Sequence, residues 1–212
     1  MTPIDRHRVL RAMSPNVWDF ANRVLYDLCR DYPAHADAQV VLAKVNLIGR
    51  VYAASIERKR PRANDETSDR FYRRTVAPLI IRSGIDRWLY KVHQTEPGTP
   101  EALAAVVEVH GLTTSLFKRI STLEKRSLAS KYLHFHRPRH FFIYDSRAVE
   151  AMRAYSSLLP RSSRSSHVGD NEYRKFAEKC TRLTAFCQRE FGLSPLPRHI
   201  DNLLLGFNES ET

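Results

Sequence analysis

Apolar residues along this chain recur mostly at intervals of three and four positions, which is the period of an amphipathic helix. Glycine, which weakens helices, occurs only seven times among the 212 residues. The pattern therefore predicts an all-α fold. We expect helices over residues 15–31, 38–58, 70–81, 85–92, 100–110, 115–120, 123–134, 146–155, 170–191 and 198–205.

Local signals set the ends of several expected helices. The first should begin at Ser14-Pro15, a capping residue followed by a proline suited to the first turn. A later helix should begin at Thr99-Pro100 and stop at Gly111, because glycine commonly terminates helices. The apolar side of the first helix is expected to consist of Val17, Trp18, Phe20, Ala21, Val24, Leu25 and Leu28.

The length fits a single helical domain over residues 1–212, built as one unit or as two small lobes that share a core. A polar, basic connection near residues 59–69 is the expected lobe boundary. The Ser- and Arg-rich stretch 160–169 is expected to be a mobile loop, and the acidic tail 208–212 is expected to fray.

The charge of the chain favours a polyanionic partner. There are 34 Lys and Arg against 23 Asp and Glu, a formal net charge of +11. Positive charge of this size binds nucleic acid strongly, because neutralising phosphates releases counterions. A basic protein without such a partner is the alternative. No basic amphipathic helix at a terminus supports a membrane surface as the partner.

The cysteines favour a reducing, intracellular (cytoplasmic) location. The chain has only Cys29, Cys180 and Cys187, an odd number without the spacing of metal ligands. The N-terminal residues lack the apolar segment of a signal peptide, and no run of about 18 apolar residues would span a membrane.

One stretch carries the candidate chemistry. Residues 127–149 predict a helix, a short basic and aromatic loop, and a second helix that opens at Asp145. Phe141-Phe-Ile-Tyr144 precede this carboxylate, and Ala148 and Val149 follow it. An acid among apolar neighbours in a chain this basic suggests a site that handles a nucleic-acid base. The alternative is a plain helix cap, since Asp is a preferred residue at that position.

The loop between these two helices carries three imidazoles and two arginines. Its sequence is His134-Phe-His136-Arg-Pro-Arg-His140. A metal site would need a companion carboxylate or a pair of cysteines, so no metal is expected. We expect His136, Arg137 and Arg139 to contact phosphates or bases. A solvated loop without a ligand is the alternative.

Two residues beside the carboxylate are further candidates for substrate binding. Tyr144 is expected to stack on an extruded base, although aromatic residues at helical spacing are usually part of a core. Arg147 lies in the first turn after Asp145, where the helix dipole disfavours a cation. We expect Arg147 to contact a phosphate or to pair with an acid.

Residues 127–149 resemble the catalytic region of the helix-hairpin-helix DNA glycosylases. In that superfamily an Ala-containing element opens a helix, and an apolar stretch then leads to the catalytic Asp at the start of the next helix. Ala129 takes the first position here and Phe141–Asp145 the second. The resemblance implies an all-α, glycosylase-like fold of two small helical lobes with a cleft between them.

The chain departs from the superfamily pattern at the hairpin. The glycine-bearing hairpin should precede Ala129, but residues 121–126 contain no glycine. Lys125 and Arg126 are expected to replace its phosphate contact by charge. Ser127 stands where bifunctional members have their Schiff-base lysine, and Lys131 lies one helical turn further along. Lys131 would substitute only if the register slips.

The resemblance implies a monofunctional DNA glycosylase that removes a damaged or modified base and leaves an abasic site. The modified bases of phage DNA are included among the possible targets. Asp145 would be the catalytic carboxylate, with Lys131 as the mechanistic alternative, and no cofactor is expected. A non-catalytic basic module that binds DNA or RNA is the competing function. A helical protein with an acidic protein partner is a third. The target base, the strandedness and the oligomeric state stay open.

Overall fold

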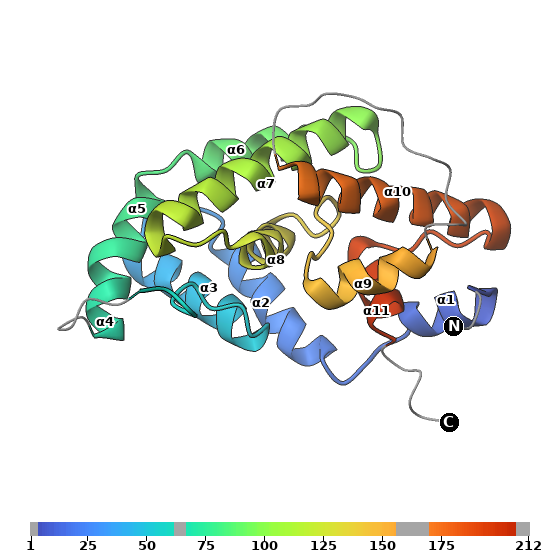
Figure 1. The fold of residues 1–212 in the computed structure, drawn as a ribbon, viewed down its shortest axis with the longest axis horizontal. Coiled ribbons are helices and arrows are strands. Elements are labelled where there is room, and N and C mark those ends of the chain that lie inside the picture. The colour runs from blue at the N-terminus through green and yellow to red at the C-terminus, as the bar shows by residue number, and fades with distance from the viewer. Residues whose placement is uncertain (1–3, 62–66, 156–169, 207–212) are drawn as a thin grey trace.

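The computed structural model describes residues 4–61, 67–155 and 170–206, and within these ranges it confirms the all-α prediction. Figure 1 shows the helices gathered around α8. The elements are α1 (Arg6–Met13), α2 (Asp19–Asp31), α3 (Ala38–Val51), α4 (Ser68–Phe71), a π-helical turn (Tyr72–Val76), α5 (Ala77–Ile81), α6 (Ile85–His93), α7 (Pro100–Ser121), α8 (Arg126–His136), α9 (Ser146–Tyr155), α10 (Asn171–Phe191) and α11 (Pro197–Leu205).

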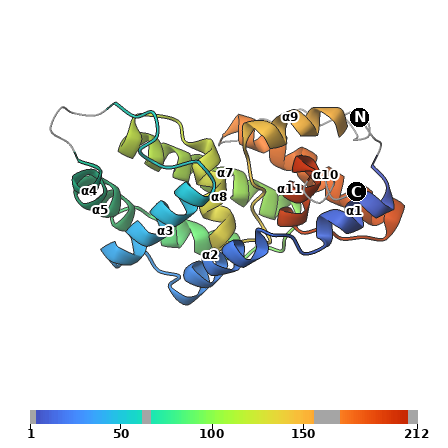
Figure 2. The same cartoon turned by 90° about the horizontal axis from the view of Figure 1, so that it is seen from below.

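The buried apolar residues form two clusters. The larger is built from α2 to α8 and one side of α10, and the smaller from α1, α9, α10 and α11. Phe142 and Tyr144 pack against both. The segment between α8 and α9 therefore lies at the junction of the clusters, as Figures 1 and 2 show from two directions. A cleft between two lobes stays a prediction.

Helix α7 corrects one sequence prediction. It continues through Gly111 to Ser121 as a single helix, whereas we expected an end at Gly111 and a separate helix over 115–120. Val109 precedes the glycine and Phe117 follows it, and both are fully buried in the larger cluster. Burial on both sides outweighs the cost of about 1 kcal/mol that a glycine imposes inside a helix.

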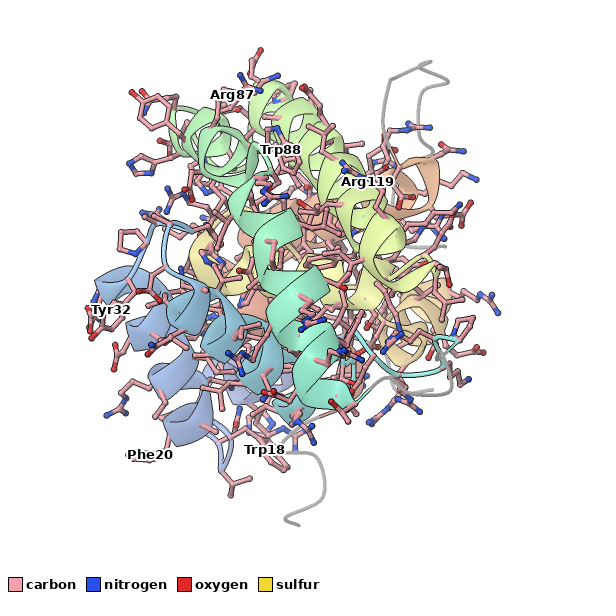
Figure 3. The ribbon with its side chains drawn as sticks, turned by 90° about the vertical axis from the view of Figure 1, so that its left-hand side faces the viewer. Trp18, Phe20, Tyr32, Arg87, Trp88 and Arg119 are labelled. Carbon is pink, nitrogen blue, oxygen red and sulfur yellow. The ribbon has the colours of Figure 1, made fainter. Side chains whose placement is uncertain are left out.

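The start of the chain also differs from the prediction. Helix α1 was not expected; the Asp5 side chain caps it, and Val9 and Ala12 are buried. Helix α2 begins only at Asp19, and its supposed apolar side is partly exposed, because Val17 and Phe20 are 82% and 74% exposed. Figure 3 shows Trp18 and Phe20 at the edge of the molecule.

The expected lobe boundary near 59–69 separates residues that share one core. Ile48 before it and Phe71 after it belong to the larger cluster. Helix α3 ends at Val51, earlier than expected, and Ala53 and Lys59 in the following turns have positive φ. The predicted mobile loop 160–169 and tail 208–212 lie outside the described residues.

Two observations concern the partners considered above. In the described ranges, no helix combines the length and the apolar character that crossing a membrane requires. Likewise, the described His, Cys, Asp and Glu side chains include no group of three that would hold a metal ion. Cys29, Cys180 and Cys187 are buried free thiols.

Candidate active site

The centre of the candidate site is a buried lysine paired with Asp145. Lys131 lies in the middle of α8 and is 3% exposed. Its Nζ lies 3.3 Å from Oδ2 of Asp145. The other carboxylate oxygen, Oδ1, accepts a hydrogen bond from the backbone N–H of Ala148 at 2.9 Å. Asp145 therefore caps α9 and pairs with an amine at the same time.

The amine of Lys131 reaches back along α8 to Ser127. Nζ donates a hydrogen bond to Oγ of Ser127 at 2.8 Å, across one turn of the helix. The amine of Lys131 therefore lies beside the side chain of Ser127. The ring centroid of Tyr52 lies 5.6 Å from Nζ on another side, close enough for a cation–π contact.

Burial controls the charge state of this amine. Desolvation lowers the pKa of Lys131 below its ordinary value, while the negative charges of Asp145 and Asp201 act to raise it. The side chain of Asp145 is 23% exposed, so the pair is open to solvent on the carboxylate side only. A buried amine with a lowered pKa beside a partly accessible carboxylate has the character of a nucleophile with a neighbouring base.

Two hydrogen-bonding side chains fix the segment that presents Asp145. Oγ of Ser130, which is fully buried, accepts a hydrogen bond from the backbone N–H of Tyr144 at 2.9 Å and lies 3.2 Å from its carbonyl oxygen. The hydroxyl of Tyr173 on α10 donates to the carbonyl of Phe142 at 3.0 Å. The approach to Asp145 is therefore tied to α8 on one side and to α10 on the other.

A set of tyrosines lies beside the pair on α2 and α3. The hydroxyl of Tyr52 donates to Oδ1 of Asn22 at 2.7 Å. The hydroxyl of Tyr26 lies 2.7 Å from Nε2 of His134, and Nδ1 of His134 lies 2.8 Å from the carbonyl of Phe141. Burial lowers the pKa of His134 to about 4, so the ring is neutral. Nδ1 must then donate to the carbonyl, which leaves Nε2 to accept from Tyr26.

We did not expect a second ion pair, which α11 brings to the same junction. NH1 of Arg198 lies 2.6 Å from Oδ2 of Asp201, and Asp201 is 2% exposed. Burial raises the pKa of Asp201 to about 6, against the opposing effect of Arg198. The charges of Asp145 and Lys131 also shift that pKa, so the two ion pairs interact.

A basic pocket lies next to Ser127. It has a volume of about 460 Å³ and is lined by Ser127, Lys125 and the turns after α3, including Arg58 and Lys59. Nζ of Lys125 donates to the carbonyl of Ser55 at 3.4 Å, which fastens those turns to the start of α8. Arg126 points elsewhere and pairs with Asp170 at 2.7 Å.

The predicted contact residues at the other end of α8 are not gathered around Asp145. His136 is buried, its Nδ1 lies 2.8 Å from the carbonyl of Tyr132, and its ring stacks on His35. Nε of Arg137 donates to the carbonyl of Leu89 at 3.2 Å. Arg139 is exposed and lines a separate pocket of about 340 Å³ between α7, α10 and α11. Nucleic-acid contacts by these three residues stay a prediction.

Tyr144 and Arg147 flank the carboxylate in different ways. The ring of Tyr144 is half-buried and lies edge-on to Phe176, with the centroids 5.4 Å apart. Arg147 is exposed in the first turn of α9. Tyr144 is therefore held by packing, while Arg147 is accessible to a partner in solution.

Comparison with known proteins adds no family to this description. No family model matches the chain, and neither does any curated protein or solved structure. The arguments about function therefore come from the residues and their geometry.

Proposed function

We propose that this protein is a DNA glycosylase that breaks the N-glycosidic bond of a damaged or modified base, with Asp145 as the essential carboxylate. The observation that carries the proposal is the 3.3 Å pair between Asp145 and the buried amine of Lys131. It joins a partly accessible acid to an amine with a lowered pKa, at the junction of two cores.

The chemistry requires both kinds of group. Breaking a glycosidic bond develops positive charge on the sugar, and a carboxylate held nearby stabilises that charge. Asp145 is fixed for this role by the N–H of Ala148 and keeps Oδ2 directed to the amine. A base in a duplex must first be flipped out of the stack to reach such a site.

The geometry favours Lys131 over water as the nucleophile. In this step the neutral amine forms a bond to C1′ of the sugar, the glycosidic bond breaks, and its electron pair leaves with the base. The proton that the new ammonium sheds passes through Asp145 to the departing base, so charge and atoms balance. The position of the amine beside Ser127, where the resembled superfamily has its lysine, supports this route.

The charge distribution supports DNA as the partner. The net charge is +11, and Arg58, Lys59 and Lys125 line the pocket next to Ser127. Phosphates on either side of a flipped nucleotide would be attracted to this pocket. Arg147, exposed two residues after Asp145, adds further positive charge near the carboxylate.

The test incubates wild type and Asp145→Asn with duplexes that carry damaged and modified bases, including phage-type modifications. We expect the wild type to release a free base and Asp145→Asn to bind the same DNA without releasing it. Glu150→Gln, an exposed acid one turn further along α9, is the matched control and should behave as wild type. Binding without base release by all three proteins would support a non-catalytic binding module instead.

A further inference from the structure

A pocket of about 340 Å³ lies between α7, α10 and α11, and neither Asp145 nor Lys131 lines it. Figure 1 shows α7 and α10 next to each other in this part of the molecule. Apolar side chains make up much of the lining, including Leu103 and Val106 of α7 and Phe142 of the segment before α9. Binding sites for small molecules have volumes upward of about 300 Å³ and mostly apolar walls. The pocket therefore has the size and the lining of a site for a small ligand.

Contacts between the surrounding elements hold the walls of the pocket in place. The hydroxyl of Tyr173 on α10 donates to the carbonyl of Phe142 at 3.0 Å. The rings of Tyr173 and of His110 on α7 are stacked, with their centroids 3.6 Å apart. Nε2 of His140, another lining residue, lies 3.0 Å from the carbonyl of Thr95. A pocket that is already formed binds a ligand without the free-energy cost of ordering its walls.

The hydroxyl groups of the pocket already donate to acceptors within the protein. Thr99, Thr181 and Thr184 each donate to a backbone carbonyl three or four residues before them, at 2.9, 3.0 and 3.1 Å. The hydroxyl of Ser194 donates to the side chain of Gln188. Because a hydroxyl has one proton to donate, these groups have none left for a ligand. This favours a ligand with an apolar body over a nucleobase, whose edge is read by hydrogen bonds.

The charge at the pocket favours an anion. Arg139 lines the pocket and is exposed, and no carboxylate of the described residues contacts it. The described lining residues include no Asp or Glu. Residues at the start of α7 and of α11 border the pocket, and the N-terminus of a helix carries partial positive charge. Burial lowers the pKa of His140, so its ring adds no charge at neutral pH. One arginine therefore meets the need of a single anionic group.

We propose that this pocket binds a small carboxylate whose remaining part is apolar. The carboxylate group pairs with the guanidinium of Arg139, whose planar fork matches two carboxylate oxygens. The apolar part lies against Leu103, Val106 and Phe142. A medium-chain fatty acid and an aromatic carboxylate both have this chemistry. The proposal goes beyond the proposed DNA glycosylase activity and holds whether or not the protein has that activity.

The test is isothermal titration calorimetry of the full chain, without DNA, with four compounds. Octanoate carries an apolar chain and naphthoate an apolar ring system, octanol is the uncharged match of octanoate, and thymidine monophosphate represents a nucleotide. We expect saturable binding of octanoate, of naphthoate or of both, with a dissociation constant on the order of 0.1 mM. Octanol and the nucleotide should bind at least about tenfold more weakly, because the first lacks the charge and the second lacks the apolar body.

The four titrations separate the possible ligands. Tighter binding of octanoate would support a fatty acid, and tighter binding of naphthoate would support an aromatic carboxylate. If neither carboxylate shows saturable binding, the proposal is overturned. Equal binding of octanol and octanoate would overturn it as well, because the charge would then play no part. Tighter binding of the nucleotide than of both carboxylates would overturn it in favour of a nucleic-acid ligand.

Substitution of Arg139 tests the proposed ion pair. Arg139→Gln should weaken octanoate binding about tenfold, because it removes the cation that meets the carboxylate. Arg139→Lys should restore part of the loss. The matched control is Arg119→Gln, since Arg119 is also exposed but lies near the opposite end of α7, on the face that Figure 3 shows. It should bind octanoate as wild type does. Equal weakening in Arg119→Gln and Arg139→Gln would overturn the proposal, because the net charge would then account for the binding.

NMR spectroscopy locates the bound carboxylate. Nuclear Overhauser effects should connect its protons to the methyl groups of Leu103 and Val106. Thr184→Phe should abolish binding because the ring fills the pocket, while Ala104→Phe, at an exposed residue of α7 outside the lining, should not. Overhauser effects confined to exposed apolar residues such as Val17 would show an adventitious surface contact and overturn the proposal. If Thr184→Phe does not fold, the Overhauser effects in the wild type decide.

Discussion

Two buried lysines, Lys44 on α3 and Lys131 in the middle of α8, differ in what faces them. Lys44 is fully buried, and its Nζ donates to the carbonyl of Ala34 at 3.3 Å. Lys131 is almost as buried but contacts Asp145, which reaches solvent. Burial lowers the pKa of both amines. A partly accessible counter-ion, not burial, therefore distinguishes the candidate site.

The surroundings of the two lysines differ in the same way. Around Lys44 the rings of His35 and His136 stack, Nε2 of His35 lies 2.8 Å from the hydroxyl of Tyr132, and these side chains are closed to solvent. Around Lys131 a carboxylate, a serine hydroxyl and a basic pocket meet. On the proposed function, the C-terminal end of α8 serves packing and its middle carries the chemistry, a difference that the following substitutions test.

The largest expected effect is on activity and separates the two lysines. Lys131→Met should lower base release at least a hundredfold, because it removes the amine that faces the carboxylate. Lys44→Met should leave base release unchanged and keep the free energy of unfolding the same or raise it by up to about 2 kcal/mol, since it removes a buried charge that no carboxylate of the described residues contacts. Single-turnover kinetics measure the base release of each variant, and urea unfolding measures its free energy of unfolding. Equal losses of base release in both variants would remove the distinction between the two lysines.

The next effect is on DNA affinity. Arg58→Gln combined with Lys59→Gln should weaken DNA binding about tenfold and make it less steeply dependent on salt, because two cations leave the pocket beside Ser127. The control is Arg82→Gln with Arg87→Gln, two exposed arginines around the start of α6. Binding titrations at several salt concentrations would measure the change in DNA affinity. An equal loss of affinity in both double variants would show that the position of the positive charge does not matter.

Acid stability should depend on His134, in the last turn of α8. His134 is neutral in the fold with a pKa of about 4, below its ordinary value of about 6.5. Between these values the unfolded chain binds a proton that the fold excludes, so stability falls as the pH drops from about 6.5 to about 4. The loss is on the order of 2–3 kcal/mol. His134→Gln should flatten this dependence in pH-dependent urea unfolding, and His93→Gln, an exposed histidine, should not.

The smallest expected effect concerns the support of Asp145. Ser130→Ala should lower the free energy of unfolding by about 1–3 kcal/mol, because it leaves the backbone N–H of Tyr144 without its partner. It should also reduce base release more than Thr113→Ala, which removes another buried hydroxyl bonded to a helix carbonyl on α7. Comparable base release by the two variants would mean that Ser130 serves stability alone.

The sequence was sufficient for the fold class and for the place of the carboxylate. Apolar spacing identified most of the helices, and Asp145 does open α9. The predicted helix end at Gly111 was wrong. The residues of α7 before and after this glycine are buried by distant parts of the chain, which the local pattern does not show. The position of Lys131 beside Ser127 follows from one helical turn, so helical geometry alone was enough to anticipate it.

The second ion pair was beyond prediction from local pattern. Asp201 lies in a short C-terminal helix whose sequence pattern is that of an ordinary amphipathic helix. Arg198 is three residues before it, a spacing that is common in ion pairs on the surface of helices. The docking of α11 against α1, α9 and α10 brings the pair to the junction. Tyr52 and Asn22 likewise come together from two helices, and nothing in either helix indicates the other.

The most direct test of the account is to locate the bond between protein and DNA. Wild type would be mixed with a duplex whose base it releases, reduced with borohydride, digested and analysed by tandem mass spectrometry. The account predicts a sugar adduct on Lys131 and none on Lys44. Base release without any adduct would contradict the amine as nucleophile and leave water activated by Asp145, and an adduct on another lysine would contradict the site itself.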